Sequence, residues 1–214
     1  MANTPEDPLK KAVRILKDGG VIAFPTDTVY GLGAAVFNLK AAERIYDIKK
    51  RSRRLPLPLL IADLSQLNSI AKPLRGIALF LAQRFWPGGL TLVLPKADSL
   101  SSYLPQSPTV AVRLPNHPIC LTLIRSLGSP IIGTSANLSG NPPALSAGEV
   151  RQQLGNKVDL IIEGECFAAV ESTIVDATRE KPLVLRQGVV SQQKIEEAME
   201  EYRESKNDAC CLRL

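Results

Sequence analysis

The sequence predicts an α/β fold with a central, mostly mixed β-sheet and flanking helices. Segments with the apolar spacing of amphipathic helices alternate along the whole chain with short apolar runs typical of buried strands. The 214 residues are 45% hydrophobic and 22% charged, which is typical of a globular protein that buries a substantial core. No repeat or change in composition divides the chain. We therefore expect a single domain over residues 1–205 and a flexible tail over 206–214.

Capping and turn residues delimit the elements of the first half of the chain. Gly19 and Gly20 give a C-cap signal after a first helix, and Pro25 stops the strand that follows. Asn38 can cap a second helix, which we expect to end by about Arg51. The predicted elements are, in order, helix 8–17, strand 21–24, the helix that Asn38 caps, strand 57–62, helix 74–85 and strand 90–94.

The second half continues the same alternation of patterns. A strand-like stretch comes first, and Ser191 caps a final helix that is predicted to end at about Arg203. The predicted elements are, in order, strand 109–114, helix 118–127, strand 130–133, helix 146–154, strands 158–162, 172–176 and 183–186, and the final helix.

Cysteine usage indicates a reducing compartment. The four cysteines form no C-x-x-C pair, and with His117 as the one histidine a tetrahedral zinc site has too few ligands at usable spacing. The first residues lack the pattern of a signal peptide. The longest apolar stretch, residues 55–62, is far shorter than the roughly 18 residues that a membrane helix needs. We expect a soluble, cytoplasmic protein without a membrane partner.

Positive charge is concentrated in one short run. The formal net charge is +5, from 26 basic and 21 acidic residues, and all of residues 49–54 except Ser52 are basic. This distribution permits an anionic partner such as a nucleotide or RNA, although most charge runs are solvated helix ends.

Common catalytic motifs are absent or incomplete. The chain has no G-x-x-x-x-G-K-[ST] phosphate loop, and the G-x-G that begins at Gly31 lacks the final glycine of a dinucleotide fingerprint. Residues 133–137 resemble a nucleophile elbow without its last glycine. His117 would be the base of a serine hydrolase, but a capping or surface role suits its place at a helix start better.

Five polar clusters lie at the ends of predicted strands, where α/β proteins usually bind ligands. Each of them, taken alone, is explained as well by a turn, a solvated helix end or an edge-strand charge. The clusters are residues 25–33, 49–51, 110–115 and 134–140, and the pair formed by 171–173 and 186–188.

Taken together, these clusters identify a family. In order, the chain carries P-T-D-T-V-Y-G-L-G, K-x-R, W-P-G-x-L-T, V-A-V-R-x-P-x-H-P, S-x-N, S-T-I-V and L-R-x-G. From about Leu9 to Val190 it resembles the YrdC-type threonylcarbamoyl-AMP synthases. The resemblance implies a twisted sheet around a deep basic cavity. It also implies the reaction of L-threonine, bicarbonate and ATP to threonylcarbamoyl-AMP and pyrophosphate, for the synthesis of N6-threonylcarbamoyladenosine in tRNA.

The resemblance also implies roles for individual residues. The catalytic residues would be Lys49, Arg51, Ser135 and Asn137. Threonine would be bound by Thr28, Arg113, Thr134 and Ser172, with the Arg113 fork on the carboxylate. ATP would be bound by Lys49, Arg51, Thr109, Ser135, Asn137 and Arg186. No covalent nucleophile is needed, because the carbamate oxygen attacks the α-phosphorus directly. Magnesium would be held by the substrate's phosphates rather than by a protein site.

One segment departs from the family pattern. Relatives commonly read K-G-R-P-x-x-[KN]-P-L where this chain has Ser52 in place of the first proline and Leu55 in place of the polar residue. We therefore expect a polar contact to the substrate to be missing and affinity or substrate range to differ.

Two other functions remain open at the level of sequence. The first is a module that binds tRNA or double-stranded RNA through the basic cavity without adenylate formation, although aromatic residues are only 5% of the chain. The second is a related nucleotidyltransferase that uses another amino acid. For a synthase, the expected partner is a tRNA threonylcarbamoyl transferase that receives the product.

Overall fold

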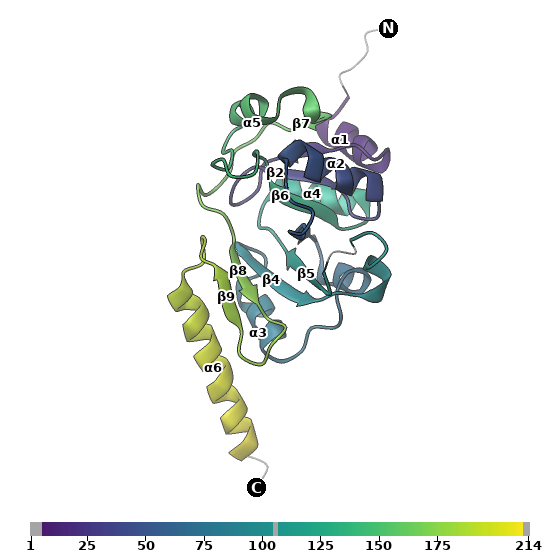
Figure 1. Ribbon diagram of the computed structural model, residues 1–214. Helices are drawn as coiled ribbons and strands as arrows, with labels where there is room; N and C mark the ends of the chain where they lie inside the picture. The colour runs from purple at the N-terminus through teal and green to yellow at the C-terminus, as the bar shows by residue number, and fades with distance from the viewer. Residues whose placement is uncertain (1–5, 105–106, 212–214) are drawn as a thin grey trace.

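A single mixed sheet runs through the protein. The structure is a computed structural model that describes residues 6–104 and 107–211, with the backbone alone for 207–211 (Figure 1). Nine strands lie in the order β7-β1-β2-β6-β3-β5-β4-β8-β9 within these described residues. They are β1 (Ile22–Phe24), β2 (Gly31–Ala35), β3 (Leu59–Leu60), β4 (Leu90–Pro95), β5 (Thr109–Arg113), β6 (Ile131–Ser135), β7 (Leu160–Ile161), β8 (Thr173–Asp176) and β9 (Leu183–Arg186).

Parallel and antiparallel pairs occur side by side in this sheet. β1 pairs with β7, β3 with β5 and β4 with β8 in parallel, whereas the other neighbouring pairs are antiparallel. The prediction of a mixed sheet is confirmed.

Helices cover both faces of the sheet. In Figure 1, α1, α2, α4 and α5 surround the half that contains β1, β2 and β6, and α3 and α6 lie beside the half that contains β4, β8 and β9. The α-helices are α1 (Pro8–Lys17), α2 (Leu39–Lys49), α3 (Gly76–Phe85), α4 (Pro118–Leu127), α5 (Ala147–Leu154) and α6 (Gln192–Cys211). Short 3₁₀ turns, η1 (Leu64–Ser69), η2 (Asp98–Leu100) and η3 (Gly155–Lys157), complete the connections. None of the helices in the described ranges is long and apolar enough to cross a membrane.

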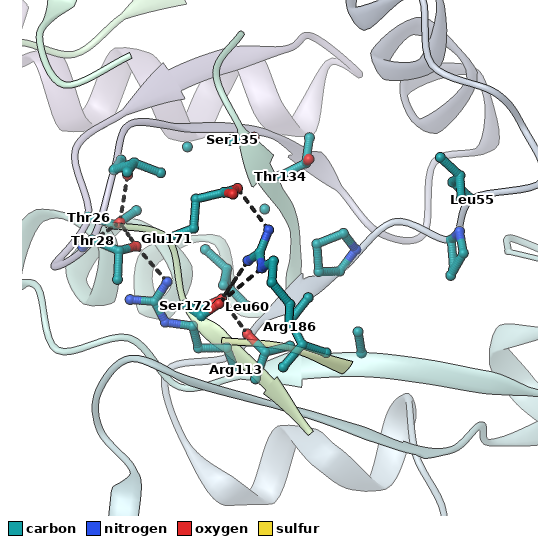
Figure 2. Close-up of a pocket in the computed structure, with 18 of the residues that line it drawn as sticks. Thr26, Thr28, Leu55, Leu60, Arg113, Thr134, Ser135, Glu171, Ser172 and Arg186 are labelled. Atoms are coloured by element: carbon teal, nitrogen blue, oxygen red, sulfur yellow. Dashed lines mark hydrogen bonds and ion pairs between the residues drawn. The ribbon is translucent and has the colours of Figure 1, made fainter. Parts of the chain in front are cut away.

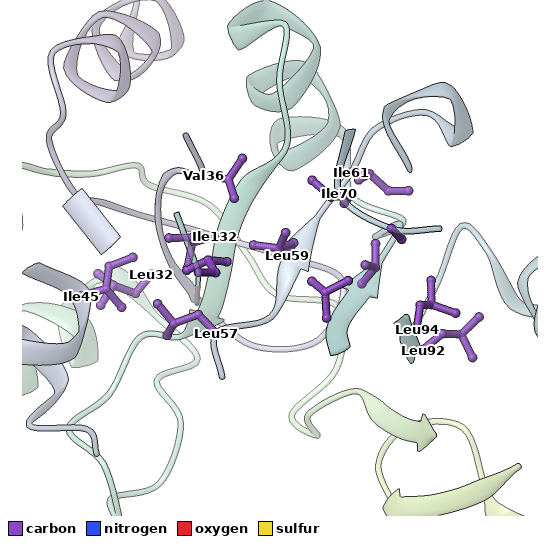
Figure 3. Close-up of a cluster of buried hydrophobic side chains, with 14 of the residues drawn as sticks. Leu32, Val36, Ile45, Leu57, Leu59, Ile61, Ile70, Leu92, Leu94 and Ile132 are labelled. Carbon is purple, nitrogen blue, oxygen red and sulfur yellow. The ribbon is translucent and has the colours of Figure 1, made fainter. Parts of the chain in front are cut away.

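One hydrophobic core joins the two halves of the sheet. Leu32 of β2, Leu59 of β3 and Leu92 of β4 belong to it and are all fully buried (Figure 3). A smaller core packs α1 and α4 on the opposite face, with Leu16 and Leu123 against β1. Because the larger core is continuous, the strands around the sheet's middle are held in fixed relative positions.

Local signals set the ends of the helices as predicted. The Asp7 side chain accepts from the backbone N–H of Leu9 at 2.9 Å, and Asn38 accepts from Ala41 N–H at 3.0 Å, so both helices are N-capped. α2 ends at Lys49, and Lys50 adopts the left-handed conformation with φ of 51°. The predicted end of this helix by about Arg51 is confirmed.

Four elements differ from the sequence pattern. β3 and β7 are shorter than the strands predicted over 57–62 and 158–162, and β2 and α6 differ more. β2 lies where no strand is predicted, because its glycines read as a turn. A Cβ atom at Gly33 would lie 2.6 Å from the carbonyl oxygen of Ile132 and 2.7 Å from the ring of Phe24, so the strand needs glycine to fit its neighbours. α6 continues past its predicted end at Arg203 to Cys211, in a stretch without glycine or proline. Residues 206–211 of the predicted flexible tail are therefore helical, and 212–214 lie outside the described residues.

Candidate active site

A cavity of about 380 Å³ opens between the two halves of the sheet (Figure 2). Its walls come from the loop after β1, the segment after α2, the ends of β4, β5 and β6, and the strands β8 and β9. Among the described residues that line it, three are arginines and one is acidic: Arg51, Arg113, Arg186 and Glu171. This size and this balance of charge suit a small anionic ligand.

Arg113 is fixed at one wall of the cavity. Its Nε donates to the carbonyl oxygen of Gly88 at 2.9 Å, and one terminal nitrogen donates to the Thr28 hydroxyl at 2.8 Å. The other terminal nitrogen lies 2.5 Å from the Asp27 carboxylate, and the side chains of both members of this ion pair are at least nine-tenths buried. Three contacts leave two of the five guanidinium N–H groups for a ligand, and they hold the fork in one orientation.

Thr26 holds the Thr28 hydroxyl in place. Thr26 donates its hydroxyl proton to the carbonyl oxygen of Val29 at 2.7 Å, so Thr28 must donate in the contact of 3.0 Å between the two hydroxyls. The Thr28 oxygen therefore keeps its lone pairs for Arg113 and for a bound molecule. The loop after β1 thus presents an oriented acceptor.

Arg186 is anchored to the turn before β8. Its Nε and one terminal nitrogen donate to the carbonyl oxygen of Ser172 at 3.2 and 2.9 Å, and the other terminal nitrogen pairs with Glu171 at 2.9 Å. Gly188 makes this approach feasible, because a Cβ atom there would lie 2.5 Å from the backbone carbon of Ser172 and would also meet the Glu171 carbonyl oxygen. This explains the glycine of the L-R-x-G motif.

Lys49 lies behind the cavity wall. Only 1% exposed, it donates through its ammonium to the carbonyl oxygens of Ser135 and Asn137, the latter at 2.8 Å, and to the Asn137 side-chain oxygen at 3.1 Å. Burial, helped by the charge of Arg51, lowers the pKa of Lys49 to about 8. All three ammonium protons are thus directed at protein oxygens.

Arg51 extends into the cavity from the segment after α2. One terminal nitrogen donates to the carbonyl oxygen of Pro56 at 3.0 Å. Burial and the nearby charge of Arg186 lower the pKa of Arg51, whereas Tyr46 and Glu171 oppose this shift. The resemblance places Lys49 and Arg51 together among the catalytic residues. In the structure Arg51 lines the cavity, whereas Lys49 lies behind its wall, so the two side chains do not converge on one site although the helix ends between them.

The cavity gathers most of the site residues that the resemblance implies. Those that line it are Thr28, Arg51, Arg113, Thr134, Ser135, Ser172 and Arg186. Lys49 and Asn137 lie behind it, and Thr109 pairs with the Ser107 hydroxyl at 2.9 Å outside it. Sequence reasoning gave no role to Asp27 and Glu171, although both belong to the polar clusters that it singled out.

His117 takes no part in the cavity. It is buried rather than at the surface, and its Nε2 contacts the carbonyl oxygen of Glu165 at 3.0 Å. It occupies the N-cap position of α4 without a capping hydrogen bond from its side chain. The idea of a serine hydrolase that uses this histidine has no geometric support.

The oxygen ligands in the cavity indicate how a magnesium ion could be held there. In the described part of the chain, no group of three or more histidine, cysteine, aspartate or glutamate side chains could hold a metal ion. The cavity offers one carboxylate, Glu171, together with hydroxyls. Such a set suits an ion that arrives already coordinated by phosphates.

Comparisons with known proteins show the family of this chain. The model of the Sua5, YciO and YrdC family, described as "Telomere recombination", matches residues 14–188. The threonylcarbamoyl-AMP synthase of Bacillus subtilis is 42% identical over 197 residues, which are 91% of this chain and 57% of that protein. This chain thus spans little more than half the length of that relative.

Solved structures give the same result. The crystal structure of Pyrococcus abyssi Sua5 complexed with L-threonine superposes with a TM-score of 0.85 and 41% identity, over 89% of this chain and 57% of that one. The crystal structure of Escherichia coli YciO superposes with a TM-score of 0.79 and 31% identity, over 87% and 92% of the two chains. The predicted α/β fold, with a mixed sheet and flanking helices, is confirmed.

Proposed function

Because this chain belongs to the Sua5, YciO and YrdC family, we propose that it is an L-threonylcarbamoyl-AMP synthase. The observation that carries the proposal is the cavity itself, in which Arg113 is fixed on one wall while Arg51 and Arg186 project from others. A substrate pair with one carboxylate and one polyphosphate needs such a separated set of cations.

The described residues suggest how the substrates bind. The free edge of Arg113 takes the carboxylate of L-threonine, and the Thr28 hydroxyl, with Thr134 and Ser172 nearby, orients the rest of the amino acid. The phosphates of ATP lie against Arg51 and Arg186, with Ser135 at the end of β6 as a further hydroxyl. Magnesium accompanies these phosphates and neutralises part of their charge.

The reaction then needs positioning rather than a covalent nucleophile. The threonine amine combines with bicarbonate to give a carbamate and water. A carbamate oxygen attacks the α-phosphorus, the bond from that phosphorus to the bridging oxygen breaks, and pyrophosphate leaves. The arginines stabilise the charge that develops on the phosphoryl oxygens. Transfer to tRNA would fall to a separate cytoplasmic transferase.

The RNA-binding alternative is not supported by the distribution of charge. Lys49 is buried and Arg51 lies in the cavity. Arg53 forms ion pairs with Glu43 at 2.6 Å and with Asp47 at 2.8 Å. The basic run therefore does not form the continuous exposed surface that RNA phosphates require.

The decisive experiment measures products directly. The purified protein is incubated with ATP and bicarbonate and with each amino acid in turn, and mass spectrometry follows pyrophosphate and the adenylate. We expect threonylcarbamoyl-AMP with threonine and none when bicarbonate is omitted. Pyrophosphate release that does not depend on threonine or bicarbonate would refute the proposal.

A further inference from the structure

Glu171 is the one acidic side chain among the described residues that line the cavity. It stands in the connection between β7 and β8, directly before Ser172. Its carboxylate lies 2.9 Å from a terminal nitrogen of Arg186, and its side chain is 35% exposed. Figure 2 shows its carboxylate pointing toward that guanidinium. An acid in a cavity for anionic substrates calls for an explanation.

The geometry of Arg186 directs one edge at this acid. Nε and one terminal nitrogen are occupied by the carbonyl oxygen of Ser172, and that terminal nitrogen is also 3.3 Å from the Ser172 hydroxyl. The Ser172 hydroxyl is itself 2.8 Å from the Thr91 hydroxyl. Arg186 is therefore held firmly, and the nitrogen that faces Glu171 marks a fixed position for an anionic oxygen.

The negative charge of Glu171 also acts on Lys49 and Arg51. The charge of Glu171 favours the protonated forms of Lys49 and Arg51, so it opposes the fall in the pKa of both groups. The charge of Arg186 acts in the opposite direction on Arg51. Arg186 thus contacts the Glu171 carboxylate directly, and the same negative charge offsets part of the repulsion between Arg186 and Arg51 when no substrate is present.

We propose that Glu171 is an internal counter-anion that occupies, at Arg186, the position of a substrate phosphate oxygen. A polyphosphate must displace the carboxylate to reach this guanidinium. The competition weakens binding of small anions and favours release of pyrophosphate, whereas ATP retains further contacts through its adenosine part. Glu171 is in this sense a specificity-determining residue, and the assignment rests on the proposed function for the identity of the anion.

Binding of inorganic pyrophosphate tests the assignment without the reaction. Calorimetry is performed without magnesium, threonine or bicarbonate on the parent chain and on Glu171→Gln, which keeps the shape of the side chain. We expect the variant to bind pyrophosphate about fivefold more tightly, since a partly exposed ion pair contributes up to about 1 kcal/mol. Glu171→Ala, a second variant in case the first folds poorly, should show the same gain.

Two controls separate competition from general electrostatics. Glu165→Gln removes the same charge from the same connection between β7 and β8. The Glu165 side chain is exposed and does not line the cavity, so this variant should bind pyrophosphate as tightly as the parent chain does. In a chain that already carries Arg186→Gln, Glu171→Gln should raise pyrophosphate affinity much less, because the guanidinium for which Glu171 and the phosphate compete is absent.

Three results would overturn the proposal. One is pyrophosphate affinity in Glu171→Gln that is equal to or below that of the Glu165→Gln control. Another is a Glu171→Gln variant that shows no gain in pyrophosphate affinity without magnesium and binds more weakly than the parent chain when the titration is repeated with magnesium, which would make Glu171 a metal ligand. Absence of pyrophosphate binding in all variants would also overturn it. Adenylate formation by the parent chain is measured separately, so failure of the proposed function is distinguishable from failure of this assignment.

Discussion

The Lys49 ammonium donates to both oxygens of Asn137, to the backbone carbonyl at 2.8 Å and to the side-chain oxygen at 3.1 Å. A third bond goes to the carbonyl oxygen of Ser135, and the backbone N–H of Ser139 returns a bond to the Lys49 carbonyl at 2.9 Å. The end of α2 is thereby tied to the loop after β6. Both signatures, K-x-R and S-x-N, are parts of one structural connection, and Ser135 reaches the cavity because Lys49 holds its backbone.

Replacement of Lys49 by methionine should destabilise the fold. Lys49→Met removes the ammonium donor from the Asn137 carbonyl and side-chain oxygens, and from the Ser135 carbonyl oxygen, which keeps a bond from the backbone N–H of Asn137 at 3.0 Å. We expect a loss of about 3 kcal/mol in the free energy of unfolding, measured with urea. The control Lys40→Met removes the same charge from the exposed face of α2 and should change stability little. Unchanged stability with a selective loss of ATP affinity would instead establish Lys49 as a substrate ligand.

Stability should depend on pH through the same residue. Burial lowers the pKa of Lys49 from 10.5 to about 8, so between these values the unfolded chain keeps a proton that the folded chain has lost. The free energy of unfolding of the parent, relative to Lys49→Met, should therefore rise with pH over this window, by at most about 3 kcal/mol.

Comparison with the variant isolates this contribution from that of Tyr30. Burial raises the pKa of Tyr30 to about 12, which makes stability fall with pH above 10. Tyr30 is present in both chains, so its effect cancels in the difference. Urea unfolding at intervals between pH 7 and 11 gives the curve, and a difference that is flat or falls with pH would contradict the low pKa of Lys49.

Replacement of Lys50 by glycine should stabilise the fold. Lys50 is the one non-glycine residue with positive φ in the described chain, at 51°, where a side chain costs about 1 kcal/mol. Lys50→Gly should raise the free energy of unfolding by roughly 0.5 kcal/mol after the entropy of glycine is subtracted. Lys40→Gly, inside α2, should lower it by about 1 kcal/mol. Equal losses in both variants would show that the Lys50 side chain makes a stabilising contact.

Local patterns predicted the elements well because caps and turns act over a few residues. The helices that begin at Pro8 and Pro118 have their predicted ends, since a proline starts each and a glycine lies close after each. β2 could not be predicted in this way. Its glycines are required by Phe24 and the backbone of Ile132, which the fold brings next to them.

In the candidate site, too, some features follow from the sequence and others depend on the fold. Motif order indicated which residues gather at the cavity, because most of the motifs lie at an end of a strand and K-x-R lies at the end of α2. It could not distinguish Arg51, which faces the cavity, from Lys49, whose charge holds the loop after β6. Nor did it indicate that Asp27 and Glu171 balance the charges of Arg113 and Arg186. Such pairings depend on distances between distant segments, which the sequence does not contain.

Arg113 should discriminate between the two substrates. Arg113→Ala would leave the buried Asp27 carboxylate unpaired and could unfold the chain, so Arg113→Lys is the better variant, with the charge kept and the fork removed. Calorimetry should show threonine affinity reduced about tenfold or more and ATP affinity nearly unchanged. Arg125→Lys, exposed on α4, is the control. Equal losses for both ligands would argue against the carboxylate assignment.

The segment from Arg51 to Pro58 should close over bound substrates. Leu55 and Pro56 are exposed at the cavity, while Arg53 ties the segment to α2 through Glu43 and Asp47. Substrate phosphates would neutralise Arg51 and draw the segment inward, as lids commonly do. Amide hydrogen exchange at residues 52–55, with and without an ATP analogue plus threonine, should slow about tenfold on binding, while residues 9–17 of α1 remain unchanged.

Removal of the ion pairs that join Arg53 to α2 should enlarge this change in hydrogen exchange. The double variant Glu43→Gln and Asp47→Asn removes both partners of Arg53, so exchange at residues 52–55 should become faster in the free protein and reach parental protection only when substrates bind. In the parent, the amide of Leu55 donates to the carbonyl oxygen of Ser52 at 3.1 Å and serves as the reporter. Equal exchange of the parent in both states would mean that Arg53 already holds the segment as a fixed wall. The departures at Ser52 and Leu55 would then shape a rigid cavity mouth rather than a lid.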